Sequence, residues 1–362
     1  MLQKAAALLL VCASMATWVG CGSTSSHYLF AAIPTSNEIV VFREDPNSGV
    51  LTQLTGSPVT AGQAVQSLVI HPSGKYFYAA NSGEGDISLF TISSNGAISE
   101  VTPRTSVSPN GVAPTVLAMD SSGSYLYVGN SGSFNISVFS IGASTGFLTP
   151  VGTPFPVGII PLNMTLSPSG GFLYVTGSTS GGGGAPQGII EAYSVTQGIP
   201  AVVTGSPFFT GVNPYGLAIA SGGGFLYTGN NIDNSISEFS INSGGALTQL
   251  ANSPLGTQYS GPVALQVSKS GNYLYVANQA SSNVTGYSIG SDGALTGLPS
   301  SPFGTAAIPG ALATDSGGKY LFVGNQKTPV IQSFSLDPGS GTLTSVSSYG
   351  VPGTPTSIVI TP

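Results

Sequence analysis

Charged residues are scarce in this chain. Lys and Arg number 7 and Asp and Glu 13, so 6% of the residues are charged and the formal net charge is −6. An ordinary globular protein contains about 25% charged residues. So few cations build no basic patch, and the composition therefore disfavours nucleic acid and anionic lipid headgroups as partners.

Cysteine and histidine are equally rare, with 2 of each. Cys12 lies within an N-terminal segment that we expect to be removed, so the mature chain would form no internal disulfide. With no Cys or His cluster and no haem-attachment motif, the sequence indicates no metal site and no cofactor. His71 follows an apolar segment at a turn position that Asp120 and Asp315 occupy elsewhere, and we interpret it as a structural turn residue.

Glycine, proline and hydrophobic residues are abundant instead. The chain has 51 Gly and 26 Pro, and 41% of its residues are hydrophobic. Short runs of Val, Ile, Thr, Tyr and Phe alternate with turn residues, a pattern typical of an all-β protein. A hydrophobic fraction of this size can bury a core, so the low charge does not indicate disorder.

A tyrosine-centred phrase occurs seven times and organises the chain. Its spacings are 48, 49, 47, 53, 48 and 47 residues, and a period of this size marks a repeat array. The first aromatic residues of the seven copies are Tyr28, Tyr76, Tyr125, Phe172, Phe225, Tyr273 and Tyr320.

Each repeat predicts four antiparallel strands, here named A to D. In the second copy, strands A, B and C cover residues 65–70, 75–80 and 87–92, and a weaker strand D follows the Asn95-Gly96 turn. Seven such units predict a seven-bladed β-propeller over residues 27–362, which we expect to be monomeric. The chain begins with strand B and ends with a strand A near 355–361, so pairing of the two termini would close the ring and leave no open inner edge.

The first 26 residues do not belong to the repeat. Lys4 and the apolar run from Ala5 to Val11 predict a signal peptide over residues 1–20. The segment from Trp18 to Cys21 resembles a bacterial lipobox, which predicts lipid attachment at Cys21 and a flexible tether over 21–26. The protein would then be an extracytoplasmic lipoprotein of the periplasm or cell surface, bound to the membrane only through its lipid. An ordinary secretory signal is the alternative.

The B–C and D–A loops are expected to share one face of the ring. At the start of the inner strands this face presents uncharged polar side chains that would suit a neutral glycan or a peptide. These candidate ligand-binding residues are Gln66, Thr115, Asn163, Tyr215 and Thr356. The same face carries an insertion at 178–187 with four consecutive glycines, which is either a lid or a neutral loop extension.

The repeated phrase, as in Pro72 to Asn81, resembles the seven-bladed lactonase family, which includes the bacterial 6-phosphogluconolactonases. The resemblance covers residues 27–362. It implies Arg and His directly after the proline that opens an inner strand, and an acidic residue directly after the strand B asparagine. In this chain no repeat has Arg or His at the two positions after the start of the inner strand. The position after the strand B asparagine holds residues such as Ser82, Gln279 and Gln326, with no carboxylate.

This difference bears on function, because lactone opening needs a group that activates water and a donor for the developing oxyanion. The sequence identifies no catalytic residue. We therefore interpret the chain first as a binding or scaffold module for a neutral glycan, a peptide or an envelope protein. The alternatives are a lactone hydrolase that uses other residues, and a purely structural element of the envelope.

Overall fold

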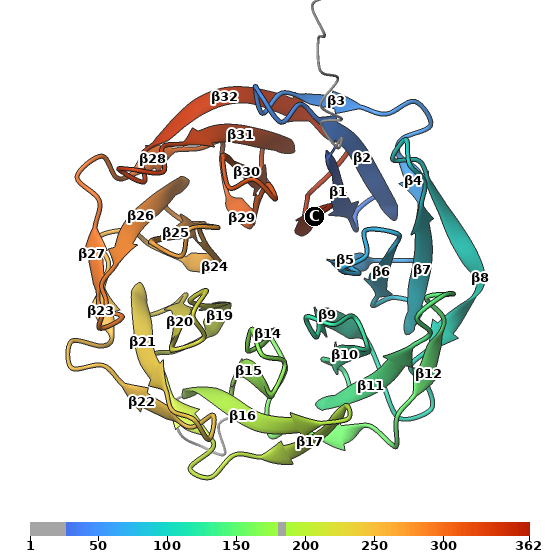
Figure 1. Cartoon of the computed structure of the whole chain (residues 1–362), viewed down its shortest axis with the longest axis horizontal. Helices are drawn as coiled ribbons and strands as arrows, with labels where there is room; N and C mark the ends of the chain where they lie inside the picture. The colour runs from blue at the N-terminus through green and yellow to red at the C-terminus, as the bar shows by residue number, and fades with distance from the viewer. Residues whose placement is uncertain (1–26, 180–185) are drawn as a thin grey trace, which may run out of the picture.

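The structure is a closed ring of seven antiparallel β-sheets around a central axis (Figure 1). This computed structural model describes residues 27–179 and 186–362. It confirms the predicted seven-bladed β-propeller. The predicted signal peptide, tether and lipidation site at Cys21 lie outside the described residues. No helix in the described ranges has the length and apolar character needed to cross a membrane.

Three strands of each blade are continuous. The A strands, nearest the axis, are β33 (Ser357–Ile360), β5 (Val65–Ile70), β9 (Pro114–Met119), β14 (Asn163–Leu166), β19 (Pro214–Ile219), β24 (Pro262–Val267) and β29 (Pro309–Thr314). The B strands are β1 (His27–Ile33), β6 (Tyr76–Asn81), β10 (Tyr125–Asn130), β15 (Phe172–Ser178), β20 (Phe225–Asn230), β25 (Tyr273–Asn278) and β30 (Tyr320–Asn325). The C strands are β2 (Glu38–Glu44), β7 (Asp86–Ile92), β11 (Asn135–Ile141), β16 (Gly188–Thr196), β21 (Ser235–Ile241), β26 (Asn283–Ile289) and β31 (Val330–Leu336).

The outer strand D is divided in five blades and continuous in two. The continuous strands are β8 (Ile98–Ser106) and β32 (Leu343–Gly350). The divided ones are β3 (Leu51–Gln53) with β4 (Val59–Thr60), β12 (Leu148–Pro150) with β13 (Phe155–Pro156), β17 (Ile199–Val202) with β18 (Phe208–Phe209), β22 (Leu247–Gln249) with β23 (Leu255–Gly256), and β27 (Leu295–Gly297) with β28 (Phe303–Gly304).

A serine–proline step explains the division in four blades. The Ser57 hydroxyl accepts a hydrogen bond from the Val41 backbone N–H at 2.7 Å, and Ser253 does the same for Glu238 at 2.8 Å. Ser206 and Ser301 repeat the contact in their own blades. The serine side chain takes over a bond that the strand D backbone would otherwise make, while the following proline has no N–H to give.

The two ends of the described chain share one sheet. The last strand, β33, pairs antiparallel with β1, and Ala31 lies opposite Ile358. Beyond the strand, the Tyr28 N–H donates to the Thr361 hydroxyl at 3.0 Å, and the Thr361 N–H donates to the Tyr28 carbonyl at 2.9 Å. This confirms the closure predicted from the order of the repeats, in which strand A of the first blade is supplied by the end of the sequence.

The first aromatic residue of every strand B lies against a glycine in the C–D turn of the next blade. Each of these glycines has a positive φ, and a Cβ on any of them would lie within 3.0 Å of a ring atom. Only glycine therefore satisfies both the turn and the contact. The pairs are Tyr28 with Gly96, Tyr76 with Gly146, Tyr125 with Gly198, Phe172 with Gly245, Phe225 with Gly293, Tyr273 with Gly341, and Tyr320 with Gly49.

The second aromatic residue of strand B reaches the same glycine through its hydroxyl. Tyr227 is fully buried and donates to the Gly293 carbonyl at 2.8 Å. Tyr78, Tyr174 and Tyr275 make the equivalent bond at 2.7, 3.0 and 2.8 Å. Tyr127 is equally buried, but its hydroxyl has no hydrogen-bond partner among the described residues. The tyrosine hydroxyl thus joins four of the blades to the next, while Phe30 and Phe322 hold the equivalent positions in the first and seventh blades.

Replacing Tyr227 by Phe should destabilise the ring. The change leaves the Gly293 carbonyl buried without its donor, which costs about 1–3 kcal/mol in the free energy of unfolding. Tyr127→Phe is the matched control, since its hydroxyl makes no such bond in the described structure, and it should be neutral or slightly stabilising. Denaturant unfolding of both variants measures the difference, and equal stabilities would contradict the proposed role of the hydroxyl.

Loss of the closing strand should destabilise every blade. We expect removal of residues 354–362 to lower the melting midpoint of the whole protein in one transition, because β1 keeps β2 but loses its inner neighbour, β33. Ile358→Ala, at a buried position of β33, should cost about 2–5 kcal/mol. Val346→Ala, at an exposed position of β32, should stay within about 0.5 kcal/mol. An unchanged midpoint after the deletion would refute closure by β33.

Candidate functional site

The ring encloses a central cavity of about 790 Å³, here called the funnel. All five residues predicted from the sequence line it, so the structure brings Gln66, Thr115, Asn163, Tyr215 and Thr356 together at the starts of five different A strands or the loops before them. Whether they bind a ligand remains a prediction. Among the described residues that line the funnel, none is Asp, Glu, His, Lys or Arg.

The lining of the funnel combines apolar surface with uncharged polar groups. Blades four and five supply apolar surface through Ile160, Leu162 and the ring of Tyr215, which is 43% exposed. Amides and hydroxyls come from Gln279, Gln326 and Thr356 of blades six, seven and one, and further amides lie on blades four and five. A flat ligand with one apolar face and a polar rim would match this arrangement.

Two of the predicted residues also connect neighbouring inner strands. The Thr356 hydroxyl donates to the Gln66 carbonyl at 3.0 Å, and the Asn163 side-chain N–H donates to the Tyr215 carbonyl at 3.1 Å. These bonds fix the positions of both side chains before any ligand arrives. The Thr115 hydroxyl is buried and has no hydrogen-bond partner among the described residues.

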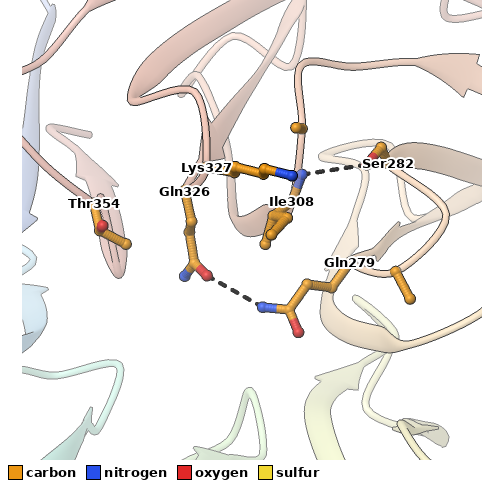
Figure 2. Close-up of a pocket in the computed structure, with 8 residues that line it drawn as sticks. Gln279, Ser282, Ile308, Gln326, Lys327 and Thr354 are labelled. Carbon is orange, nitrogen blue, oxygen red and sulfur yellow. Dashed lines mark hydrogen bonds between the residues drawn. The ribbon is translucent and has the colours of Figure 1, made fainter.

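A second cavity of about 710 Å³, here called the side pocket, adjoins the funnel between blades six and seven. The two cavities share Gln279 and Gln326, whose side chains point toward each other in Figure 2. The Gln279 Nε2 donates to the Gln326 Oε1 at 3.1 Å. Lys327, with Ser282, Ile308 and Thr354, lines the side pocket and brings the one positive charge found in the described lining of either cavity.

Buried asparagines place these two glutamines. Asn278 ends β25 with its side-chain N–H donating to Asn283 at 2.9 Å, and Asn325 ends β30 with a bond to Gln332 at 3.1 Å. Each bond crosses from strand B to strand C and fixes the residue that follows the asparagine. The glutamines and Lys327 were missed as candidates, although a repeated polar position directly after the asparagine was available as a signal.

The other ionisable groups of the described chain lie outside both cavities. Arg104 pairs with Glu84 and, at 2.5 Å, with Glu100 at the outer edge of blade two. His71 lies in its A–B turn, where Nδ1 accepts the Ser73 N–H and Nε2 lies 3.1 Å from the Gly123 carbonyl, the contacts of a structural turn residue. The insertion at 178–187 falls partly on residues outside the described ranges, so its role as a lid stays a prediction.

One buried ionic cluster was not predicted from the sequence. The Nδ1 of His27 lies 3.0 Å from the Glu44 carboxylate where the first blade meets the seventh. Burial, and then the nearby Asp315 carboxylate, raise the pKa of Glu44 to about 7. This cluster is on the A–B face of the ring, away from the funnel mouth.

The model of the lactonase family of seven-bladed β-propellers matches residues 58–160, 186–308 and 287–360, so the chain belongs to this family. No curated protein sequence matches the chain. The fold is similar to that of a candidate 6-phosphogluconolactonase from Bacteroides fragilis, with a TM-score of 0.81, 21% identity and coverage of 94% of this chain and 99% of that one.

A periplasmic gluconolactonase from Pseudomonas aeruginosa also has the same fold. Its TM-score is 0.75, its identity is 22%, and the match covers 93% of this chain and 99% of that one. A candidate 6-phosphogluconolactonase from Bacteroides uniformis gives a TM-score of 0.79 at 19% identity, with coverage of 93% and 99%. These structural matches confirm the fold, and the family match confirms the resemblance to the seven-bladed lactonase family.

Gly310→Ala should disturb the site without disturbing the core. A Cβ at this position of β29 would lie 2.3 Å from the Gln326 Nε2, so the flexible glutamine has to move and lose its bond to Gln279. A crystal structure of the variant should show Gln326 displaced. The free energy of unfolding of the variant should stay within about 0.5 kcal/mol of that of the parent. Gly304→Ala, where a Cβ would meet nothing within 4 Å, is the control. An unmoved Gln326 in the Gly310 variant would contradict the packing argument.

Proposed function

We propose that the protein hydrolyses an uncharged sugar lactone, or a similar neutral cyclic ester, in the funnel. Membership of the lactonase family supports the reaction class. The observation that carries the substrate class is the lining: its described residues are uncharged and combine a tyrosine ring with several amides. A phosphorylated lactone would need several cations to hold its charge, and the described lining of the two cavities supplies Lys327 alone.

Three residues of the two cavities would have distinct roles in this reaction. The exposed face of Tyr215 would receive the apolar face of the sugar ring. The side-chain N–H groups of Gln326 would donate to the carbonyl oxygen as it gains negative charge, a contribution of about 10²–10³ in rate for one well-placed donor. Lys327, at the rim, would attract the carboxylate that ring opening produces.

The uncharged lining also favours a second candidate function. Water activation near neutral pH uses a general base, and the described lining of the funnel contains no carboxylate or imidazole. A binding module for a neutral glycan or a peptide would use the same Tyr215 platform and the same amides without that requirement. This is the function expected first from the sequence, and it shares its site with the lactonase proposal.

We also propose that the protein works outside the cytoplasm, attached through a lipid on Cys21. The small residue before Cys21 and the preceding apolar run support this. The similar protein from Pseudomonas aeruginosa is described as periplasmic, and gluconolactone carries no phosphate, which agrees with a neutral substrate. Metabolic labelling with a fatty acid, compared with a Cys21→Ser variant, tests the attachment.

Lactone turnover tests the main proposal. Proton release from glucono-1,5-lactone should exceed the spontaneous rate, and the 6-phosphorylated lactone should be a poorer substrate. Gln326→Ala should lower kcat about 100-fold, whereas Lys269→Ala, on the opposite face, should leave it unchanged. Binding of intact neutral sugars without any turnover, lost in Tyr215→Ala, would replace the lactonase proposal by the binding module. If the protein neither hydrolyses these lactones nor binds neutral sugars, both proposed functions are wrong.

A further inference from the structure

A buried ionic cluster stands where the ring closes, at the contact between the first and the seventh blade. His27 begins β1, Glu44 ends β2 directly opposite it, and Asp315 comes from the turn after β29. All three are buried, and one ligand atom from each lies within 4.8 Å of the other two. None of them lines the funnel or the side pocket.

Glu44 occupies a position that is apolar in every other blade. It is the seventh residue of the strand C segment, and its carboxylate is fully buried with a relative exposure of 1% for the residue. A buried carboxylate is costly unless it is paired or bound to a cation, so this replacement needs a compensating partner. The corresponding residues are Ile92, Ile141, Val195, Ile241, Ile289 and Leu336.

The hydrogen bonds in the cluster leave one oxygen without a partner. The Glu44 Oε2 lies 3.0 Å from the His27 Nδ1, whereas its Oε1 is buried and has no hydrogen-bond partner among the described residues. This oxygen lies beside an imidazole and a second carboxylate. A bound cation would supply the partner that it lacks. With a neutral imidazole and both carboxylates ionised, as ligands must be, the cluster would carry two negative charges, which equal the charge of one divalent cation.

Neighbouring groups already hold two of the three side chains in a ligating orientation. The His27 Nε2 lies 3.0 Å from the Ser316 hydroxyl, which leaves Nδ1 free to face the carboxylates. Asp315 accepts the Tyr320 N–H at 2.6 Å and the Gly317 N–H at 3.0 Å. Outer contacts of this kind orient the imidazole and carboxylate ligands of metal sites.

We infer that His27, Glu44 and Asp315 form a site for a divalent transition-metal ion such as Zn²⁺, which joins the first blade to the seventh. One imidazole and two carboxylates suit Zn²⁺, whereas Ca²⁺ and Mg²⁺ prefer oxygen ligands alone. Tetrahedral Zn²⁺ sets its ligand atoms about 3.4 Å apart. The three atoms need to approach by little more than an ångström to reach that geometry.

The ion would act as a second closure of the ring. Pairing of β33 with β1 joins the termini near the axis, and the site joins the first residue of β1 to the turn after β29 in the seventh blade. Binding to the folded ring and not to the unfolded chain would raise stability with ion concentration. The inference concerns stability and is independent of the proposed lactonase activity.

Metal binding by the full, untagged chain tests this inference. After dialysis against chelator and then against Zn²⁺, elemental analysis should find one equivalent of zinc in each chain. Saturating Zn²⁺ should raise the melting midpoint by about 5 °C, and Mg²⁺ should have no comparable effect. Glu44→Gln should abolish both the stoichiometric zinc and the Zn²⁺-dependent shift.

A second variant keeps the test valid if Glu44→Gln folds poorly. Glu44→Ile restores the side chain that four other blades carry at this position, so the ring should fold without zinc and show no Zn²⁺ response. Glu238→Gln is the matched control: Glu238 is a buried glutamate of β21 that accepts the Leu295 N–H at 3.0 Å, and the variant should keep the full response. Zinc that fails to bind the parent chain, or that binds Glu44→Ile equally well, would overturn the inference in favour of a proton shared between His27 and Glu44.

Discussion

The contact between an aromatic residue of strand B and a glycine of the next blade is the constraint on which this ring depends. It recurs at all seven junctions between blades, and it needs both partners, because any Cβ on the glycine would meet the ring. Four buried tyrosine hydroxyls add a hydrogen bond to the same glycines. The contact therefore holds every blade against the next around the whole ring.

A rigid ring explains how so few charged residues can suffice. Strand pairing and inter-blade packing satisfy most of the backbone, and stacked rings such as Phe30, Phe77 and Phe90, with centroids 5.0 and 4.7 Å apart, fill the spaces between sheets. Side chains at the starts of the A strands are then free to form a lining. In this protein they form one without formal charge, which favours a neutral ligand, while the ionisable groups of the described chain lie elsewhere.

Family membership and the lining of the funnel constrain function in different ways. The family supports the proposed lactone chemistry, and the uncharged lining supports the proposal of a substrate that needs no cluster of cations. Gln326 is central to both statements, because it faces the funnel and the side pocket at once and holds Gln279 beside it. The same geometry suits a binding module, so turnover distinguishes the two and structure alone does not.

The repeat was enough to predict the number of blades, the order of strands A to D and closure by the C-terminal strand. It was enough because each blade repeats one local pattern, and the pattern carries its own inter-blade contact. Gln66, Thr115, Asn163, Tyr215 and Thr356 were also placed correctly at the funnel, since their column begins each inner strand. Residues at equivalent positions of the repeats can thus be predicted to lie at the same level around the axis.

Contacts between residues in different columns came only from the tertiary structure. The meeting of His27 and Glu44 with Asp315, almost 300 residues away, joins positions with no common spacing in the sequence. Gln279 and Gln326 are equivalent positions of the repeat, but the hydrogen bond between them is seen only in the tertiary structure. Such contacts depend on how neighbouring blades turn about the axis and on where the ring closes. A period along the chain determines the fold, and the packing of non-equivalent positions decides the chemistry.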